Sequence, residues 1–308
     1  MYLSHYGLAE PPFAITPDPR FVFLSERHRD GLAHLLYGIG QGGGGGFVQL
    51  TGEVGTGKTT LCRLLLEQLP EKVQVALVLN PKQTPLELLT TVCEELHIAL
   101  PGKRRSLKMQ VDALNKYLLQ AYAQGLRVVL IIDEAQELSR EALEQVRLLT
   151  NLETATQKLL QIVLLGQPEL RETLTRPALR QLAQRITARY HLTPLQLAET
   201  DAYLRHRINI AGGSRFPFDN AAVNRLYALS GGVPRLLNVL GERALLAGYV
   251  HGKASVDAAL VNLAAKEVLP DDARQSRDRL VLGWVLIALG ALMLWLWLAL
   301  GLNLKGVF

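Results

Sequence analysis

Residues 47–66 read "FVQLTGEVGTGKTTLCRLLL", and this stretch decides the fold of the 308-residue chain. An apolar run at 47–50 leads into a loop with the spacing G-x-x-x-x-G-K-T, and a helical pattern follows. Glycines in such a loop let backbone N–H groups turn inward around phosphate oxygens, which also face the positive end of the next helix. The stretch therefore predicts a nucleotide-phosphate loop between a strand and a helix.

The polar side chains of this loop have distinct predicted roles. Lys58 is expected to reach the β- and γ-phosphates of ATP, and the hydroxyl of Thr59 is expected to bind Mg²⁺. The backbone of the loop supplies the remaining contacts with the phosphates. The predicted nucleotide-binding residues are Gly52, Glu53, Val54, Gly55, Thr56, Gly57, Lys58, Thr59 and Thr60. ATP and Mg²⁺ are the predicted cofactors.

A second motif, "VVLIIDEAQ", supplies two adjacent carboxylates at 133 and 134. Asp133 ends an apolar strand and is a predicted Mg²⁺ ligand, while Glu134 is placed to polarise the attacking water. A carboxylate pair at a strand end is also common at the start of a solvated loop, but its combination with the phosphate loop favours catalysis. Because a water-activating base is already present, the pair favours a hydrolase over a kinase.

Short apolar runs alternate with amphipathic helical patterns as far as residue 195. The predicted strands are "FVQLTG", "VQVALVLN", "RVVLIIDE", "LQIVLLGQ" and "ITARYHL". The helical patterns cover 25–41, 58–69, 85–96, 107–124 and 139–155. This alternation predicts an α/β fold with a mostly parallel sheet covered by helices on both faces.

Beyond residue 195 the strand pattern stops and the composition becomes helical. Four helices are predicted, at 199–211, 220–229, 234–249 and 256–268. The expected organisation is an α/β nucleotide-binding domain (1–194), an all-α lid domain (195–268) and a polar linker (269–279).

The bulk composition narrows the functional classes without choosing among them. A formal net charge of +5 permits contact with anionic lipid or nucleic acid but requires neither. Cys62 and Cys93 both lie in helical patterns, which favours reduced thiols over a disulfide framework. The seven histidines show no ligand spacing, so no metal other than Mg²⁺ is predicted. The N-terminus lacks the pattern of a signal peptide, so the folded part is expected in the cytoplasm.

One basic run, "GKRRSLK" at 102–108, lies between two predicted helices. A solvated loop is one interpretation, and contact with nucleic acid, phospholipid or an acidic partner is the other. The run has no interleaved aromatic residues of the kind that single-strand-binding proteins use for stacking.

The segment 280–302 contains no charged residue. At about 1.5 Å per residue a helix of this length spans roughly 34 Å, which is enough to cross a hydrocarbon core. The flanking residues Arg274, Arg277 and Arg279 precede it, and only Lys305 follows. The segment therefore predicts a single transmembrane helix with the preceding domains in the cytoplasm and 303–308 as a short periplasmic tail.

The order of the motifs carries a family resemblance. "GEVGTGKTT", "LIIDEAQ", "LLGQPEL", "RITARYHLTPL" and "SGGVPRLLN" resemble those of AAA+ ATPases, and more narrowly those of the ExeA/GspA family of secretion-pathway ATPases. The opening stretch "MYLSHYGLAEPPFAITPDPRFVFLSERH" is similar to that family too. The resemblance covers the chain from Met1 to the apolar tail.

The resemblance implies a role in the bacterial inner membrane. Proteins of this family form oligomeric rings of cytoplasmic ATPase domains that drive assembly of a type II secretion or pilus-type envelope machine. A GspB/ExeB-like partner in the inner membrane and placement of the outer-membrane secretin are implied as well. The family continues into a periplasmic peptidoglycan-binding region, whereas only 303–308 follow the apolar segment here. Either the sequence is truncated, or the protein is tail-anchored and depends on a partner for contact with peptidoglycan.

The resemblance also implies roles for further residues. Gln167 corresponds to sensor 1, a polar side chain near the γ-phosphate, and Arg235 corresponds to sensor 2 on the lid. The arginine finger, which reaches the nucleotide of a neighbouring subunit, is assigned to Arg185, with Arg180 and Arg189 as alternatives.

The adenine pocket has weaker candidates in the proline-rich N-terminal segment. Phe13, Ile15 and Pro19 are implied by the resemblance, and ordinary core packing is the alternative interpretation of the same side chains.

Two other functions are compatible with the same motifs. A nucleic-acid-binding ATPase of the transposition-regulator type has a similar core, and the basic run suits it, but the predicted membrane helix argues against nucleic acid as a partner. The other is a nucleotide-gated scaffold with little turnover.

Overall fold

The computed structural model describes residues 1–16, 18–40, 46–100 and 106–269. The predicted transmembrane segment 280–302, most of the predicted linker and most of the basic run lie outside these residues. Within the described ranges, no helix combines the length and the apolar character that crossing a membrane requires.

The chain divides into two compact units, each with its own internal packing. One unit lies within Pro17–Leu195 and contains the sheet, and the other combines Met1–Thr16 with the described residues from Gln196 to Leu269. The boundary between the two units, after Leu195, falls within one residue of the predicted domain boundary at 194. The first sixteen residues, however, pack with the helical unit, whereas the sequence placed them in the nucleotide-binding domain.

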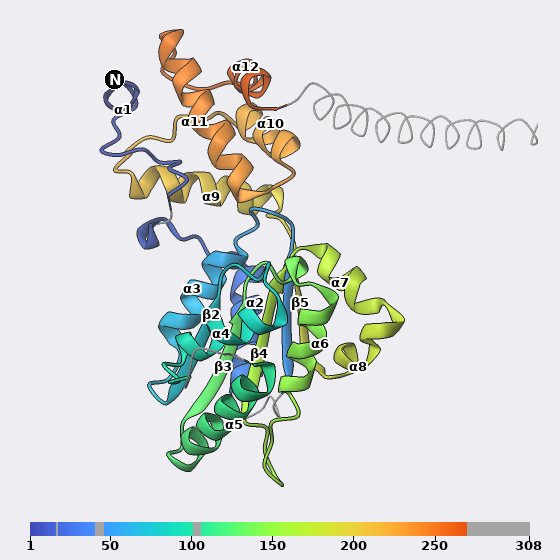
Figure 1. Cartoon of the computed structure of the whole chain (residues 1–308). Coiled ribbons are helices and arrows are strands. Elements are labelled where there is room, and N and C mark those ends of the chain that lie inside the picture. Colours follow the sequence, from blue (N-terminus) through green and yellow to red (C-terminus); the bar gives the residue numbers. More distant parts are fainter. Residues whose placement is uncertain (17, 41–45, 101–105, 270–308) are drawn as a thin grey trace, which may run out of the picture. The chain divides into compact units, whose positions relative to one another are not determined.

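The sheet unit is built on five parallel strands in the order β2-β3-β4-β1-β5 (Figure 1). The strands are β1 (Phe47–Gly52), β2 (Val73–Val78), β3 (Arg127–Ile132), β4 (Leu160–Gly166) and β5 (Ile186–Leu192). Every residue of β1 and β4 is buried, as expected for central parallel strands covered on both faces. The predicted parallel sheet is confirmed.

Strand register brings the polar motifs to one edge of this sheet. Thr51, near the end of β1, lies opposite Gly166 of β4 and His191 of β5. Ile132, the last residue of β3, lies opposite Leu164 of β4. Because all five strands run in the same direction, the loops that follow β1, β3 and β4 leave the sheet side by side.

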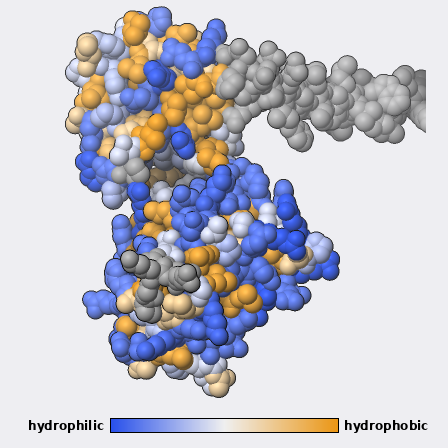
Figure 2. Space-filling view, viewed as in Figure 1, coloured by the Kyte–Doolittle hydropathy of each residue, from blue (hydrophilic) through white to orange (hydrophobic). Residues whose placement is uncertain are grey.

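Helices cover both faces of the sheet. On one face, α2 (Glu26–Ile39) and α3 (Lys58–Gln68) contribute Leu35 and Leu61 to a buried apolar cluster with β1. The opposite face carries α4 (Pro85–Glu95), α5 (Leu107–Ala123), α6 (Arg140–Leu149), α7 (Pro168–Thr175) and α8 (Arg180–Gln184). The visible surface of the unit is mostly hydrophilic, with scattered hydrophobic residues (Figure 2).

Two helical features of this unit differ from the predictions. The helix predicted to reach residue 155 ends at Leu149, where the hydroxyl of Thr150 donates to the carbonyl of Arg147. Helices α7 and α8 were not predicted. Their signals were nevertheless present, since α7 begins with Pro168 and has Glu169 in its first turn.

The helical unit contains α9 (Leu197–Ile210), α10 (Asn220–Ser230), α11 (Pro234–Val250) and α12 (Ala258–Val268), together with the short α1 (Tyr2–His5). The N-terminal segment is fastened to it by the buried Arg207, whose guanidinium donates to the carbonyls of Pro12 and Ala14. Phe13 is buried against Phe218. Phe13 therefore follows the core-packing interpretation, and the neighbouring Ile15 is exposed.

Candidate functional site

The phosphate loop connects β1 to α3 and depends on glycine at three positions. Gly55 and Gly57 have φ values of +82° and +106°, which side chains with a Cβ rarely adopt. At Gly52, a Cβ would lie 2.6 Å from the carbonyl oxygen of Leu192 on β5. The glycine spacing that identified the loop is therefore required by its backbone conformation and by its contact with the neighbouring strand.

Lys58 folds back over this loop. Its Nζ donates to the carbonyl oxygens of Gly52, at 2.8 Å, and Glu53, at 3.0 Å. The side chain is buried, and this burial lowers the pKa of Lys58, while the carboxylates of Glu134 and Asp133 act in the opposite direction. The ammonium group is thus held at the loop, where a phosphate would offset its desolvation.

Two oxygen-bearing side chains, those of Thr59 and Asp133, lie together where the magnesium site is predicted. The hydroxyl of Thr59 donates to Oδ2 of Asp133 at 3.1 Å, and Asp133 is buried. Oδ1 of Asp133 accepts from the backbone N–H of Glu134 at 2.9 Å, which fixes the carboxylate. A hydroxyl beside a buried carboxylate is a donor set that fits Mg²⁺, which binds few protein ligands and takes phosphate and water oxygens for the rest.

Glu134 adopts a strained conformation between the ends of β3 and β4. Its φ is +50°, in the left-handed region that is uncommon for residues other than glycine. Its Oε2 accepts from Nε2 of Gln136 at 2.7 Å and from Nε2 of Gln167 at 3.3 Å. The predicted water-activating carboxylate and the predicted sensor therefore share a hydrogen-bond network.

Gln136 is a member of this network that the sequence analysis did not assign. Its Oε1 accepts from the backbone N–H of Gln167 at 2.9 Å, so the side chain joins the end of β3 to the start of α7. A Cβ at Gly166 would lie 2.9 Å from this oxygen, and glycine there leaves room for the amide. Its position in "DEAQ", two residues after Glu134, was an available signal.

His28 is a second residue that the sequence analysis missed. It lies in the first turn of α2, is buried, and places Nε2 2.9 Å from the carbonyl oxygen of Thr56 in the phosphate loop. Its Nδ1 is 2.7 Å from the hydroxyl of Ser25, the N-cap of the same helix. No local sequence pattern indicates that the histidine reaches the loop.

Comparison with known proteins shows the family of the chain. Residues 41–174 match a family described as an AAA domain. The chain is 50% identical over 268 residues to General secretion pathway protein A of Aeromonas hydrophila, an alignment that covers 87% of this chain and 48% of that protein. The chain is a homologue of General secretion pathway protein A with an AAA domain. The predicted family resemblance is confirmed, although the chain spans about half the length of this relative.

Solved structures confirm the fold at low sequence identity. Cdc6p of Pyrobaculum aerophilum superimposes with a TM-score of 0.64 at 18% identity, covering 84% of this chain and 70% of that one. Drosophila ORC bound to DNA gives a TM-score of 0.61 at 20% identity, covering 86% and 66%. The RuvB Holliday junction branch migration motor of Thermotoga maritima gives 0.52 at 18%, covering 81% and 71%. The chain has the α/β AAA+ P-loop fold, a parallel sheet flanked by helices.

The three candidate finger arginines differ in their surroundings. The guanidinium of Arg185 donates to the hydroxyl of Thr150 and to Oδ1 of Asn151, so it is engaged at the C-terminal end of α6. Arg189 donates to the carbonyl of Ala183. Arg180 is exposed at the start of α8, and its guanidinium has no hydrogen bond or ion pair to any described residue.

Arg180 and Arg189 also line a common cavity. Its volume is about 570 Å³, and Arg171 of α7 and the buried Gln49 of β1 line it as well. No carboxylate side chain is among the described residues that line it. Among the three candidates, Arg180 is the one whose guanidinium has no partner among the described residues, although the sequence favoured Arg185.

The predicted second sensor, Arg235, lies on the other unit. Arg235 is exposed in the first turn of α11. Gly231 and Gly232, which lie just before this turn, have φ values of +62° and +76°, and this left-handed backbone terminates α10. Its contact with nucleotide stays a prediction.

Proposed function

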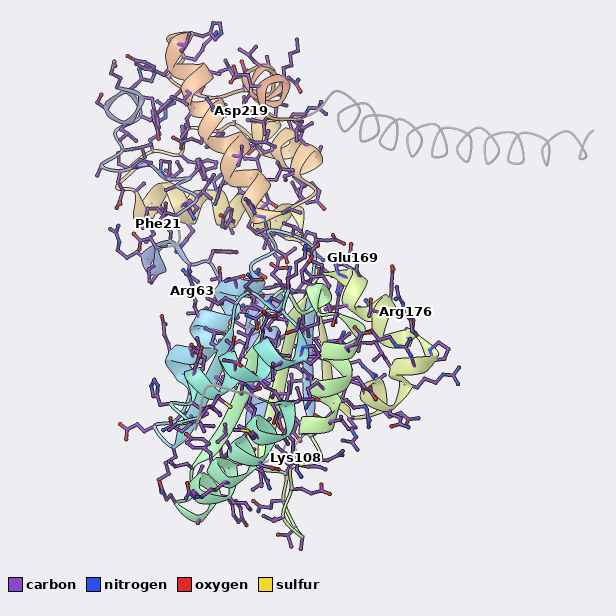
Figure 3. All side chains as sticks on the ribbon, viewed as in Figure 1. Phe21, Arg63, Lys108, Glu169, Arg176 and Asp219 are labelled. Atoms are coloured by element: carbon purple, nitrogen blue, oxygen red, sulfur yellow. The ribbon has the colours of Figure 1, made fainter. Side chains whose placement is uncertain are left out.

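We propose that the chain is a Mg²⁺-dependent ATPase that hydrolyses ATP to ADP and phosphate. The observation that carries the proposal is the meeting of Lys58, the Thr59–Asp133 pair and Glu134 at one edge of the sheet. Glu169 in the first turn of α7 is at the same edge (Figure 3) and contributes to the electrostatic environment of Lys58. A nucleophile-activating base thus stands beside a phosphate-binding cation.

In this proposal each side chain acts on one part of the reaction. Lys58 binds the β- and γ-phosphates, and Thr59 and Asp133 would hold Mg²⁺, which neutralises charge on the phosphate oxygens when bound. Glu134 orients the attacking water and accepts its proton. Gln167 and Gln136 hold the carboxylate of Glu134, since both donate to its Oε2.

The proposal includes a neighbouring subunit. Phosphoryl transfer develops negative charge that a guanidinium in trans offsets. Arg180 is the proposed finger, because it is exposed and without a described partner. ATP turnover per subunit would then rise with protein concentration as copies assemble.

Turnover of the purified full chain with ATP and Mg²⁺ tests the enzymatic part. Lys58→Ala is expected to lose ATP binding, while Glu134→Gln is expected to bind ATP and to hydrolyse it far more slowly than the parent. Phosphate release at the parent rate by both variants would refute the site assignment. Tight ATP binding and ATP-driven assembly by the parent, without phosphate release, would favour the scaffold instead.

The cellular role we propose is assembly of a type II secretion or pilus-type envelope machine from the inner membrane. The name of the relative from Aeromonas hydrophila supports a secretion role, and the apolar segment 280–302 supports anchoring. The proposed partners are other copies of the chain and a GspB/ExeB-like inner-membrane protein, with contact to peptidoglycan through a partner or a further region.

Complementation tests this cellular role. Cells lacking the protein are expected to regain secretin multimers in the outer membrane with the parent gene but not with the Glu134→Gln gene. Membrane fractionation of the full chain, compared with a chain ending at 269, tests the anchor. A full chain that stays entirely in the soluble fraction would refute anchoring by 280–302.

A further inference from the structure

We propose that His28 is a positioning residue that turns the Thr56–Gly57 peptide so that the N–H of Gly57 faces the nucleotide phosphates. The inference rests on the proposed function, because it assigns a role within the same phosphate site. It is carried by the contact between Nε2 of His28 and the carbonyl oxygen of Thr56, 2.9 Å apart and 28 positions apart in the sequence.

The two partners of the His28 imidazole determine which of its nitrogens carries the proton. A carbonyl oxygen only accepts hydrogen bonds, so the nitrogen facing Thr56 must carry the hydrogen. Nδ1 then faces the hydroxyl of Ser25 at 2.7 Å, and in the neutral ring it accepts from that hydroxyl. Ser25 is buried as well and caps α2, so the ring is held from a fixed helix end.

The contact with His28 also determines the direction of the Thr56–Gly57 peptide. No described peptide bond is cis, and in a trans peptide the C=O and N–H groups point in opposite directions. With the carbonyl of Thr56 turned toward His28, the N–H of Gly57 is turned away from it. That N–H has no acceptor among the described residues, which leaves it available to a phosphate oxygen.

Without His28, the phosphate loop would have other backbone conformations available. Gly57 has a φ of +106°, and glycine populates several backbone regions at little cost. A free Thr56–Gly57 peptide is therefore able to rotate and to present its carbonyl to the phosphates. The imidazole opposes this rotation, and it also packs closely, since a Cβ at Gly57 would lie 3.0 Å from its Nε2.

Two substitutions separate the hydrogen bond from the packing. His28→Leu fills similar space without a donor, and His28→Gln places an amide N–H near the position of Nε2. The affinity of the full chain for ATP and for inorganic pyrophosphate is measured by calorimetry. Loss of one buried hydrogen bond that orders the loop is expected to weaken both affinities about tenfold in His28→Leu. His28→Gln is expected to stay within about threefold of the parent.

A matched control removes a buried hydrogen bond elsewhere. Tyr203 donates to Oδ1 of Asn238 at 2.6 Å within the helical unit. Tyr203→Phe is expected to lower resistance to urea about as much as His28→Leu while leaving pyrophosphate affinity at the parent value. Selective ¹⁵N labelling of the seven histidines adds a spectroscopic readout, in which one imidazole is the Nε2–H tautomer with Nδ1 as acceptor and is missing from His28→Gln.

The outcomes distinguish this inference from the proposed function. Equal affinities in the parent and His28→Leu would overturn the role of His28 and leave the ATPase proposal intact. Equally weak binding by the Leu and Gln variants would show that ring volume, and not the donor, matters, and would also overturn it. Absence of ATP and pyrophosphate binding by the parent would overturn the proposed function itself.

Discussion

The phosphate loop at 52–60 and the arginine-bearing segment at 176–189 differ in how their functional groups are held. In the loop, the side chains of Lys58 and Thr59 bind to groups of their own chain. In the other segment, Arg185 and Arg189 also donate to their own chain. Arg180, however, is exposed without a described partner, and Arg176 projects from the end of α7 (Figure 3). In the proposed mechanism, a single copy preorganises the groups that act on its own nucleotide, whereas the arginine proposed to act on a neighbour would be ordered by assembly.

The largest loss of ATP hydrolysis is expected when the phosphate loop still binds ATP but the proposed base, Glu134, is removed. Glu134→Gln preserves the size of the side chain and removes its ability to accept a proton. ATP hydrolysis is expected to fall by about 10²- to 10⁴-fold with little change in ATP affinity. Steady-state phosphate release and equilibrium ATP binding check this, and hydrolysis within tenfold of the parent would refute the role of Glu134.

The arginine segment is tested next. Arg180→Ala is expected to lower turnover of the assembled protein by about 10³-fold, in the range seen for arginine fingers. Its Tm is expected to match the parent, because Arg180 has no described partner to lose. Mixing Arg180→Ala with Lys58→Ala supplies the sharper measurement, since subunits with opposite defects are expected to restore phosphate release at mixed interfaces. If the mixture stays inactive while it assembles, Arg180 does not act in trans.

A smaller loss is expected for the residue that holds the base. Gln136→Leu removes the 2.7 Å hydrogen bond to Glu134 and the contact with the N–H of Gln167. Turnover is expected to fall about 10- to 100-fold with KM unchanged, because the carboxylate loses its orientation toward water. Gln136→Glu, which cannot donate from a carboxylate, serves as the matched variant, and parent-like kinetics in both would refute the assignment.

The smallest expected effect is a loss of folding stability on substitution of Arg185. Its guanidinium binds Thr150 and Asn151 just beyond α6, so Arg185→Ala is expected to lower the free energy of unfolding by about 1–2 kcal/mol. Chemical denaturation measures this loss, with Arg180→Ala as the exposed control. Unchanged stability together with a large loss of turnover would return the finger assignment to Arg185.

Much of the fold was predictable because its signals are local. The five strands follow from apolar runs, and the phosphate loop follows from glycine spacing that the backbone requires at Gly55 and Gly57. Asp133 and Glu134 were identified because they directly follow a buried strand. Helix α7 was not predicted from the sequence, although its initial proline and its first-turn glutamate are local signals of a helix start.

Other features depended on contacts between distant segments. The placement of Met1–Thr16 with the helical unit follows from Arg207, which binds backbone carbonyls nearly two hundred positions away. No pattern around either segment encodes that contact. The same holds for Arg185, whose engagement with residues after α6 distinguishes it from Arg180 only once the packing is known.

The sequence by itself determined which groups this site contains: a loop with phosphate-binding spacing, a hydroxyl and a carboxylate that are predicted to bind Mg²⁺, and an adjacent carboxylate that is predicted to act as the base. These groups are set by spacing along single strand–loop segments, which local backbone preferences fix. The tertiary structure alone decided that Gln136 and Gln167 hold Glu134 and that His28 holds the phosphate loop. Those hydrogen bonds join segments that meet only because the strand order and helix packing bring them to one edge of the sheet.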